Sequence, residues 1–283
     1  MSSKGTRHAR GKGNDPKLLN GLTEVSVHGK RKRLGSGFMN IEGRVIIVTG
    51  ASSGIGFATA KLLAKQGAEL ALVSRSRDKL ERLSSELLNS FAVPADMTRI
   101  CEVESMVGKT MEHFGRIDVL VNCAGQGYDA PVEKTNVNTF HRIFDLDVVG
   151  PLVAMEQVIP IMRKQGGGTI VNVSSGTALM YLPYNGAYSG LKRALANISL
   201  TARGELKKDN IVVSVVYPYM TLTDFEKNTI KDAIPEGGEQ DGDPPFPADT
   251  AEYFAQKIME GIENGIAEIF AHDWMKKRAN ANS

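Results

Sequence analysis

A tyrosine and a lysine four positions apart, Tyr188 and Lys192 in the stretch YNGAYSGLKRAL, are the first candidates for chemistry. On a helix, side chains with this spacing share a face. A free phenol has a pKa of about 10 and exchanges protons slowly at neutral pH, but a neighbouring ammonium favours the phenolate and is expected to lower that pKa. The pair alone would suit an ordinary helix surface equally well. Tyr181 and Tyr184 have no lysine four residues on and are interpreted as walls of a pocket.

A glycine-rich turn, TGASSGIG, joins an apolar run at 44–50 to a helical pattern at 56–67. Residues without a Cβ allow backbone amides to approach a pyrophosphate at the positive end of a helix. The strand before the turn and the helix after it are the context that a dinucleotide site requires. The expected cofactor contacts in this turn are Gly50, Ser52, Ser53, Gly54, Ile55 and Gly56.

Apolar runs alternate with helical patterns along most of the chain. Strands are expected at 44–50, 68–74, 91–96, 117–125, 168–175, 211–218 and 267–272, and further helices at about 77–88, 137–164 and 188–207. Continuous apolar strands separated by helices indicate a parallel sheet covered on both faces. The predicted fold is therefore an α/β, doubly wound Rossmann domain with about seven strands.

The end of the second strand bears on which dinucleotide binds. Sites that select NAD present a carboxylate there to the ribose 2′-hydroxyl. This chain has Ser74 at that place, followed by Arg75, and a guanidinium suits a 2′-phosphate. NADP(H) is therefore favoured as the cofactor over NAD(H), while Arg77 is interpreted as a solvated helix residue.

Four motifs in order, TGASSGIG, NCAG (122–125), VNVSS (171–175) and YSGLK (188–192), resemble those of the short-chain dehydrogenase/reductase family over residues 42 to 272. The resemblance implies that Tyr188 protonates a carbonyl oxygen as hydride arrives, that Ser175 hydrogen-bonds that oxygen, and that Lys192 also holds the nicotinamide ribose. By position it further implies cofactor contacts at Asp96, Met97, Asn122, Ala124, Gly125, Pro218, Thr221 and Thr223, besides Tyr188 and Lys192.

The chain departs from the family pattern at two functional positions. The family's catalytic asparagine aligns with Asp147, which is expected either to pair with Lys192 or to be protonated, or only to mark a kink in a helix. The usual glycine after Pro218 is Tyr219, whose ring would narrow the pocket beside the nicotinamide. A third change, Cys123 beside Asn122, is expected to affect only packing.

The predicted function is NADP(H)-dependent reduction of a carbonyl on a small or lipid-like apolar substrate, since the stretches 176–186 and 219–248 offer apolar and aromatic side chains with few charges. A sugar or an acyl-carrier thioester stays open. The alternatives are an NAD-linked alcohol dehydrogenase and, from another class, a nucleotide-binding regulator that has lost catalysis through Asp147.

Charge and composition complete the expectations. Residues 1–40 hold nine Lys or Arg and two Asp or Glu, which predicts a basic, largely disordered arm ahead of a single domain at 41–283. The polar stretch 231–249 is interpreted as a mobile lid. Two cysteines suggest neither disulfides nor a metal cluster, and no apolar stretch is long enough to span a membrane. The expected location is cytoplasmic, with no nucleic acid as partner, and the expected assembly is a homodimer or homotetramer.

Overall fold

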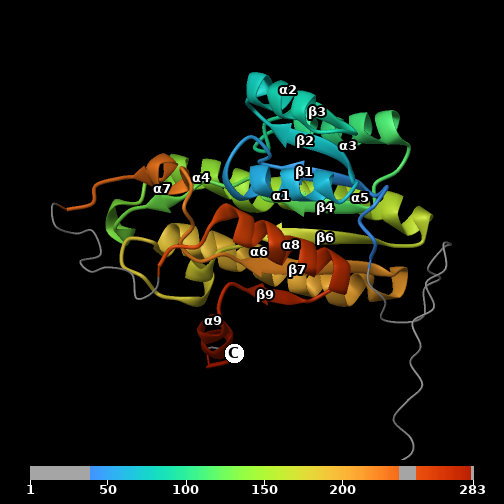
Figure 1. The fold of residues 1–283 in the computed structure, drawn as a ribbon. Coiled ribbons are helices and arrows are strands. Elements are labelled where there is room, and N and C mark those ends of the chain that lie inside the picture. Colours follow the sequence, from blue (N-terminus) through green and yellow to red (C-terminus); the bar gives the residue numbers. More distant parts are fainter. Residues whose placement is uncertain (1–38, 236–246, 282–283) are drawn as a thin grey trace, which may run out of the picture. The chain divides into compact units, whose positions relative to one another are not determined.

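The computed structural model describes residues 39–235 and 247–281, and in this part of the chain all seven predicted strands form one parallel sheet (Figure 1). The order is β3-β2-β1-β4-β6-β7-β9. The strands are β1 (Val45–Thr49), β2 (Glu69–Ser74), β3 (Ser90–Pro94), β4 (Val119–Asn122), β6 (Gly168–Val173), β7 (Ile211–Tyr217) and β9 (Glu268–Phe270). The order reverses between β1 and β4, which confirms the doubly wound Rossmann fold. Nearly all of the predicted arm and most of the predicted lid lie outside the described residues.

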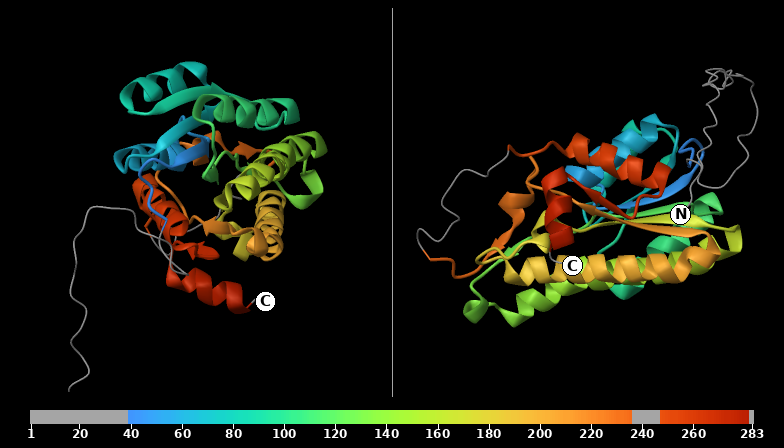
Figure 2. Two further views of the ribbon diagram at one scale, coloured as in Figure 1. Left: turned by 90° about the vertical axis from the view of Figure 1, so that its right-hand side faces the viewer. Right: turned by 90° about the horizontal axis from the view of Figure 1, so that it is seen from below.

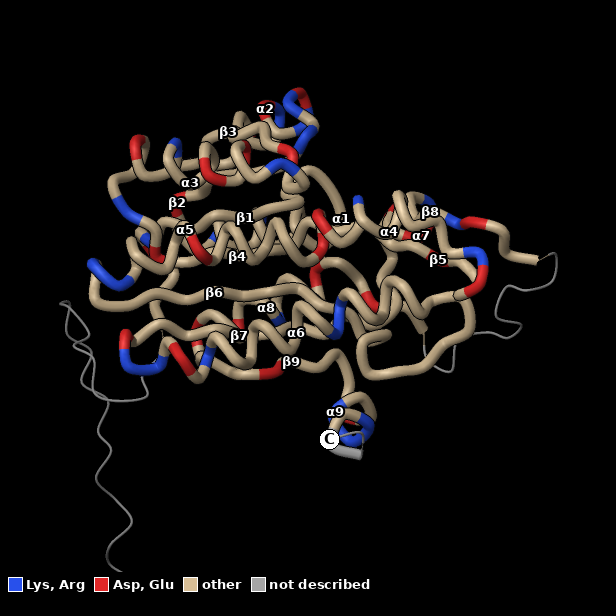
Figure 3. The backbone as a smooth tube through the Cα atoms, turned by 180° about the vertical axis from the view of Figure 1, so that it is seen from behind, with Lys and Arg blue, Asp and Glu red and all other residues tan. Residues whose placement is uncertain are grey.

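The strands form where the sequence is almost free of charge. Apart from Glu69 and Glu268, no residue of the seven strands is charged, and Figure 3 shows the charged positions gathered on helices and loops. Every residue of β1 and β6 is buried. Such runs are typical of parallel strands whose two faces are both covered.

Helices cover the two faces of the sheet separately, as the end-on view in Figure 2 shows. The helices are α1 (Gly54–Lys65), α2 (Arg77–Glu86), α3 (Ile100–Phe114), α4 (Val137–Phe144), α5 (Gly150–Gln165), α6 (Gly186–Leu206), α7 (Phe225–Asn228), α8 (Ala251–Asn264) and α9 (Asp273–Ala281). Side chains of a strand alternate between faces, so Ile46 and Val48 pack with α1, α2 and α8, whereas Ile47 packs with α3 and α5.

The helix predicted at 137–164 is interrupted, which corrects its expected continuity. Between α4 and α5 the residues Asp145–Val149 form a π-helical turn. A π turn inserts extra backbone into a helix and is often found at functional sites. Here it directs the side chain of Asp147 into the interior, where that side chain is fully buried.

A second, two-stranded sheet was not expected from the sequence. Strand β5 (Tyr128–Asp129) pairs in parallel with β8 (Ile230–Lys231). Two-residue strands have no hydrophobic period to reveal them. Their pairing ties the segment that follows β7 to the loop that follows β4, beside the carboxyl ends of the central strands.

Candidate active site

The glycine-rich turn lies at the carboxyl end of β1 and opens directly into α1. Gly50 has φ +70° and Gly54 has φ +54°, backbone conformations that favour glycine. A Cβ on Gly56 would fall on the carbonyl oxygen of Gly50, so this position also requires glycine. The N-cap residue, Ser53, makes no side-chain capping hydrogen bond. The first amides of α1 are therefore left to bind an anion such as a pyrophosphate, and a dinucleotide fits this turn.

Strands β4 and β6 follow β1 in the sheet, and hydrogen bonds join their carboxyl ends to the glycine-rich turn and to each other. The hydroxyl of Thr49 accepts hydrogen bonds from the backbone N–H groups of Cys123 (3.0 Å) and Ala124 (3.1 Å), which fixes the loop after β4 against the turn. The amide Nδ2 of Asn122 donates to Oδ1 of Asn172 at 2.8 Å. Asn122 thus joins β4 to β6.

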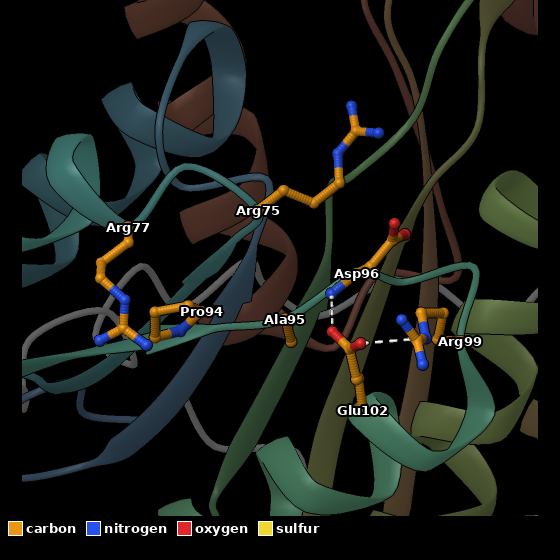
Figure 4. A pocket seen from close by; sticks show the side chains of 7 residues that line it. All are labelled: Arg75, Arg77, Pro94, Ala95, Asp96, Arg99 and Glu102. Atoms are coloured by element: carbon orange, nitrogen blue, oxygen red, sulfur yellow. Dashed lines mark hydrogen bonds and ion pairs between the residues drawn. The ribbon is translucent and has the colours of Figure 1, made fainter.

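A pocket of about 390 Å³ lies at the ends of β2 and β3, and its lining includes Arg75, Arg77 and Asp96. Figure 4 shows the Arg75 and Asp96 side chains extending in the same direction, while Arg77 extends away from them. Arg77 pairs with Glu81 on the exposed face of α2. Among the described residues no ion pair involves Arg75 that would compete with a bound phosphate. Ser74 accepts a hydrogen bond from the N–H of Ser76 at 3.1 Å, so its hydroxyl proton stays available to a ligand.

A buried ion pair forms the centre of the site. The Nζ atom of Lys192 lies 3.1 Å from Oδ2 of Asp147, and the two side chains are 4% and 0% exposed. Lys192 also donates to the carbonyl oxygen of Val173 at 3.2 Å, and Oδ1 of Asp147 accepts from the N–H of Gln126 at 3.1 Å. A Cβ built on Gly125 would lie 3.1 Å from the ammonium, so the loop after β4 approaches it closely. Of the possibilities for Asp147, the structure shows the pairing with Lys192.

Tyr188 lies on the same face of α6, with the Lys192 ammonium 5.8 Å from the centre of its ring. The phenol is buried and interacts with the hydroxyl of Ser175. The four residues named from the sequence, Tyr188, Ser175, Lys192 and Asp147, therefore lie together at one site. The expected direction of the pKa is nevertheless wrong. Burial, followed by the negative charge of Asp147, raises the pKa of Tyr188 well above its ordinary value, and the Ser175 hydrogen bond offsets this only in part. Lys192 is not among the groups that lower this pKa, and its ammonium lies beside the carboxylate of Asp147.

The Ser175 hydroxyl is held by its own turn. Its Oγ atom accepts hydrogen bonds from the N–H (3.2 Å) and the hydroxyl (3.0 Å) of Thr177. Since both of these bonds use oxygen lone pairs, the hydroxyl proton of Ser175 remains to be donated toward Tyr188 or a substrate oxygen. Sequence reasoning missed Thr177: a serine that accepts from the N–H two residues on is a common turn, but the part played by the Thr177 hydroxyl had no signal in the sequence.

The segment after β7 closes the other side of the site. The ring of Phe225 lies 5.9 Å from the ring of Tyr188, and the side chain of Thr223 lies within 3.5 Å of the position that a Cβ on Gly54 would take. The side-chain amide of Gln126 donates to the carbonyl oxygen of Asn228 at 2.9 Å. Gln126 and Phe225 were not predicted; each is a single residue whose role depends on contacts between distant segments.

The remaining predicted contacts are more peripheral. Thr221 donates to the carbonyl oxygen of Tyr219 (2.9 Å) and forms a bridge with Asp249. Pro218 accepts from the N–H of Gly176 at 2.6 Å. The carbonyl of Met97 lies where a Cβ on Gly150 would fall, which places it against the start of α5.

Of the two tyrosines predicted to be pocket walls, Tyr181 does line a pocket. Tyr181 is mostly exposed, lies beside the guanidinium of Arg193 and lines a different pocket, of about 380 Å³, that includes Met180 and Arg193. Tyr184 takes a left-handed conformation with φ +64°, and its carbonyl accepts from the N–H of Ala130. Tyr184 therefore serves the shape of the loop before α6.

Comparison with known proteins agrees with this geometry. The sequence pattern of the family described as short chain dehydrogenase matches residues 44–233. The chain belongs to this family of oxidoreductases. It is 37% identical over 185 residues to an uncharacterized oxidoreductase of Staphylococcus haemolyticus, covering 65% of this chain and 80% of that protein. It is 32% identical over 245 residues to 11-beta-hydroxysteroid dehydrogenase-like 2 of Arabidopsis thaliana, covering 84% and 77%.

Solved structures of the family lead to the same conclusion. L-sorbose reductase of Gluconobacter frateurii, crystallised with NADPH and L-sorbose, superposes with a TM-score of 0.73 at 27% identity, covering 84% of this chain and 97% of that one. Structures of similar fold include complexes with NADH as well as NADPH. Among the described residues, no helix combines the length and the apolar character needed to cross a bilayer.

Proposed function

We propose that this short-chain dehydrogenase reduces the carbonyl of an apolar substrate with NADPH. The observation that carries the proposal is the meeting of Tyr188, Ser175 and Lys192 at the carboxyl edge of the sheet, on the side where Gly125 approaches the ammonium. The glycine-rich turn lies on the same edge, so a dinucleotide bound there would extend toward Tyr188.

The reaction joins one hydride and one proton to the carbonyl. Held by the glycine-rich turn and Arg75, NADPH would provide the hydride for the carbonyl carbon and would leave as NADP⁺. Tyr188 gives its phenolic proton to the oxygen as the C=O π bond breaks, which leaves an alcohol and a phenolate that solvent reprotonates. Ser175 donates a hydrogen bond to the same oxygen and stabilises the charge that develops on it. Lys192 donates one ammonium proton to the carbonyl oxygen of Val173 and pairs with Asp147, and a further ammonium proton would serve the nicotinamide ribose.

The preference for NADPH rests on the pocket at the end of β2. Ser74 and Arg75 stand where an NAD-selective site would present a carboxylate. We expect Arg75→Ala to weaken NADPH binding by about tenfold or more, the size of one charge-assisted contact, and to leave NADH binding nearly unchanged. Arg77→Ala is the matched control and should change neither affinity. A wild-type protein that binds NADH more tightly than NADPH would favour the NAD-linked dehydrogenase instead.

The apolar character of the substrate rests on the segment after β7. Met220, Leu222 and Phe225 expose 49%, 68% and 38% of their surfaces, and Phe225 also faces Tyr188. Exposed large apolar side chains beside a reactive group are typical of a site for an apolar ligand. The name of the Arabidopsis relative points to a steroid and that of the solved reductase to a sugar, so a hydroxysteroid-like ketone is the first substrate class to test and a keto sugar the contrast.

The test is NADPH oxidation with a panel of ketones, in wild-type protein, Tyr188→Phe and Tyr181→Phe. Tyr188→Phe removes only the phenolic oxygen and should lower kcat by about a hundredfold or more, the usual contribution of a general acid. Tyr181→Phe, which changes an exposed ring in the loop before α6, should behave like wild type. Full activity in Tyr188→Phe would overturn the proposed chemistry.

The second candidate, a nucleotide-binding regulator, is favoured by one observation: Asp147 neutralises Lys192 where the family has an asparagine. It predicts NADPH binding without turnover of any ketone in the panel. The homo-oligomer also stays a prediction. The apolar side chains Leu191, Leu195 and Ile198 of α6 would suit a second subunit by their spacing, but Leu191 and Leu195 are buried within their own chain and Ile198 is partly buried there.

A further inference from the structure

The Asp147–Lys192 pair allows an inference that rests on the proposed function and extends it. Asp147 enters the site from the π turn Asp145–Val149, and its carboxylate is held from two sides, by the Lys192 ammonium (3.1 Å) and by the N–H of Gln126 (3.1 Å). Neither charged side chain reaches solvent to any extent. The two side chains are held together, because removing either charge would leave the other buried and uncompensated.

The ionisable groups around Tyr188 come from several elements. Lys192 lies one turn further along α6, Asp147 on the π turn, Asp129 on β5 and Cys123 in the loop after β4. Burial raises the pKa of the Cys123 thiol to about 12, so this thiol is uncharged at neutral pH. The ammonium is therefore offset by Asp147, and the phenol faces no excess of positive charge.

We propose that Asp147 is a positioning residue that holds Lys192 as half of a neutral pair and thereby favours the proton-donating form of Tyr188. The direction of the Tyr188 pKa supports this, since the charge of Asp147 is the second largest cause of its rise, after burial. Asp147 itself touches neither substrate nor cofactor in this scheme. It acts through Lys192 and through the field at the phenol.

The consequence for catalysis is a shift of the working pH range. Reduction needs the protonated phenol, so its rate is lost as the pH rises through the pKa of Tyr188. A raised pKa moves that loss to higher pH. Removing the charge of Asp147 restores a net positive charge beside the phenol, so the loss should begin at lower pH.

The experiment replaces Asp147 by asparagine, the residue that the family pattern carries there, and measures kcat/KM for the best ketone of the panel at saturating NADPH across the alkaline range. We expect the alkaline limb of Asp147→Asn to lie about one to two pH units below that of wild type, the usual effect of one nearby charge. Asp145→Asn is the matched control: it makes the same change two residues away on the same π turn, and its profile should superpose on that of wild type. Superposable profiles of Asp147→Asn and wild type would overturn the proposal.

A readout without turnover separates this inference from the proposed function. Tyrosinate absorbance of the cofactor-free protein is titrated in wild type and Asp147→Asn, each compared with the same protein carrying Tyr188→Phe. The Tyr188 contribution should appear at lower pH in Asp147→Asn, and an unchanged position would contradict the inference. Full turnover in Tyr188→Phe would remove the proposed function, whereas loss of turnover there with unshifted titrations would remove only the role of Asp147.

Should Asp147→Asn fail to fold, Asp129→Asn tests the same electrostatics. The carboxylate of Asp129 also raises the pKa of Tyr188, by less than that of Asp147. Its removal should move the tyrosinate titration in the same direction by a smaller amount. No movement, or movement to higher pH, would show that carboxylates do not control the phenol and would overturn the proposal.

Discussion

Replacing Lys192 by methionine should destabilise the protein strongly, and the structure gives the size of the effect. Methionine keeps most of the length and apolar stem of lysine but removes the charge. The ammonium lies 3.1 Å from the Asp147 carboxylate, and the two side chains are 4% and 0% exposed. Removing one partner of such a pair leaves a buried charge without compensation, which costs about 3–5 kcal/mol of the free energy of unfolding.

The loss should depend on pH in a defined direction. Burial raises the pKa of Asp147 above its ordinary value of 3.8, and Lys192 is the main influence that lowers it again. Without Lys192 the pKa of Asp147 in the folded protein rises further, so the folded state takes up a proton at higher pH than the unfolded state does. Stability is then regained as the pH falls through that raised pKa and is lost as the pH rises through the same window.

Urea unfolding followed by circular dichroism at mildly acidic, neutral and mildly alkaline pH measures this prediction. The control is Lys227→Met, which breaks a lysine–aspartate pair whose side chains are 80% and 68% exposed, and should change the unfolding free energy far less. In the double variant Lys192→Met/Asp147→Asn much of the loss should be recovered. A loss at neutral pH no larger than that of the control, or one that does not vary with pH, would refute the reasoning.

Three further predictions concern single contacts. Gly56→Ala should cost about 1–3 kcal/mol of unfolding free energy, because the added Cβ would meet the carbonyl oxygen of Gly50. The control is Gly108→Ala in α3, where the added Cβ has open space; in the same urea assay it should be neutral or stabilising by up to about 1 kcal/mol. Thr177→Val removes the hydroxyl that orients Ser175 and should lower kcat by about tenfold with little change in the dissociation constant of NADPH; equal kcat values would contradict this role. Phe225→Ala should raise KM for a bulky apolar ketone more than for a small one, and a uniform change would argue against its contact with substrate.

Strong local signals made most of the fold predictable. Each of the seven strands is an apolar run bounded by turns. The glycine-rich turn requires glycine because Gly50 and Gly54 have positive φ and because a Cβ on Gly56 would meet the carbonyl oxygen of Gly50. The π turn and the pair β5–β8 gave no such signal. Two-residue strands and one extra backbone unit inside a helix arise from tertiary contacts, which local propensity does not encode.

The residues that form the site could be predicted from the sequence, but the electrostatic effect that they have on Tyr188 could not. Spacing on a helix placed Tyr188 beside Lys192, and the aligned position of Asp147 suggested a pair. Residue types and spacing in the sequence could not show whether the pKa of Tyr188 is raised or lowered. That direction depends on how deeply the phenol is buried and on whether the Lys192 ammonium pairs with Asp147 or lies free beside Tyr188. The spacing of four residues suggested that the Lys192 ammonium interacts mainly with Tyr188. In the folded chain the ammonium lies 3.1 Å from the carboxylate of Asp147 instead.

The most direct measurement of the proposed chemistry follows the hydride itself. NADPH carrying deuterium at both C4 positions of the nicotinamide is incubated with a ketone of the panel, and the alcohol is examined by mass spectrometry. We predict deuterium on the carbinol carbon with wild type and with Tyr181→Phe, and almost none with Tyr188→Phe. An alcohol without deuterium, or the same labelled yield from Tyr188→Phe, would contradict proton donation by Tyr188 to a carbonyl that accepts the cofactor's hydride.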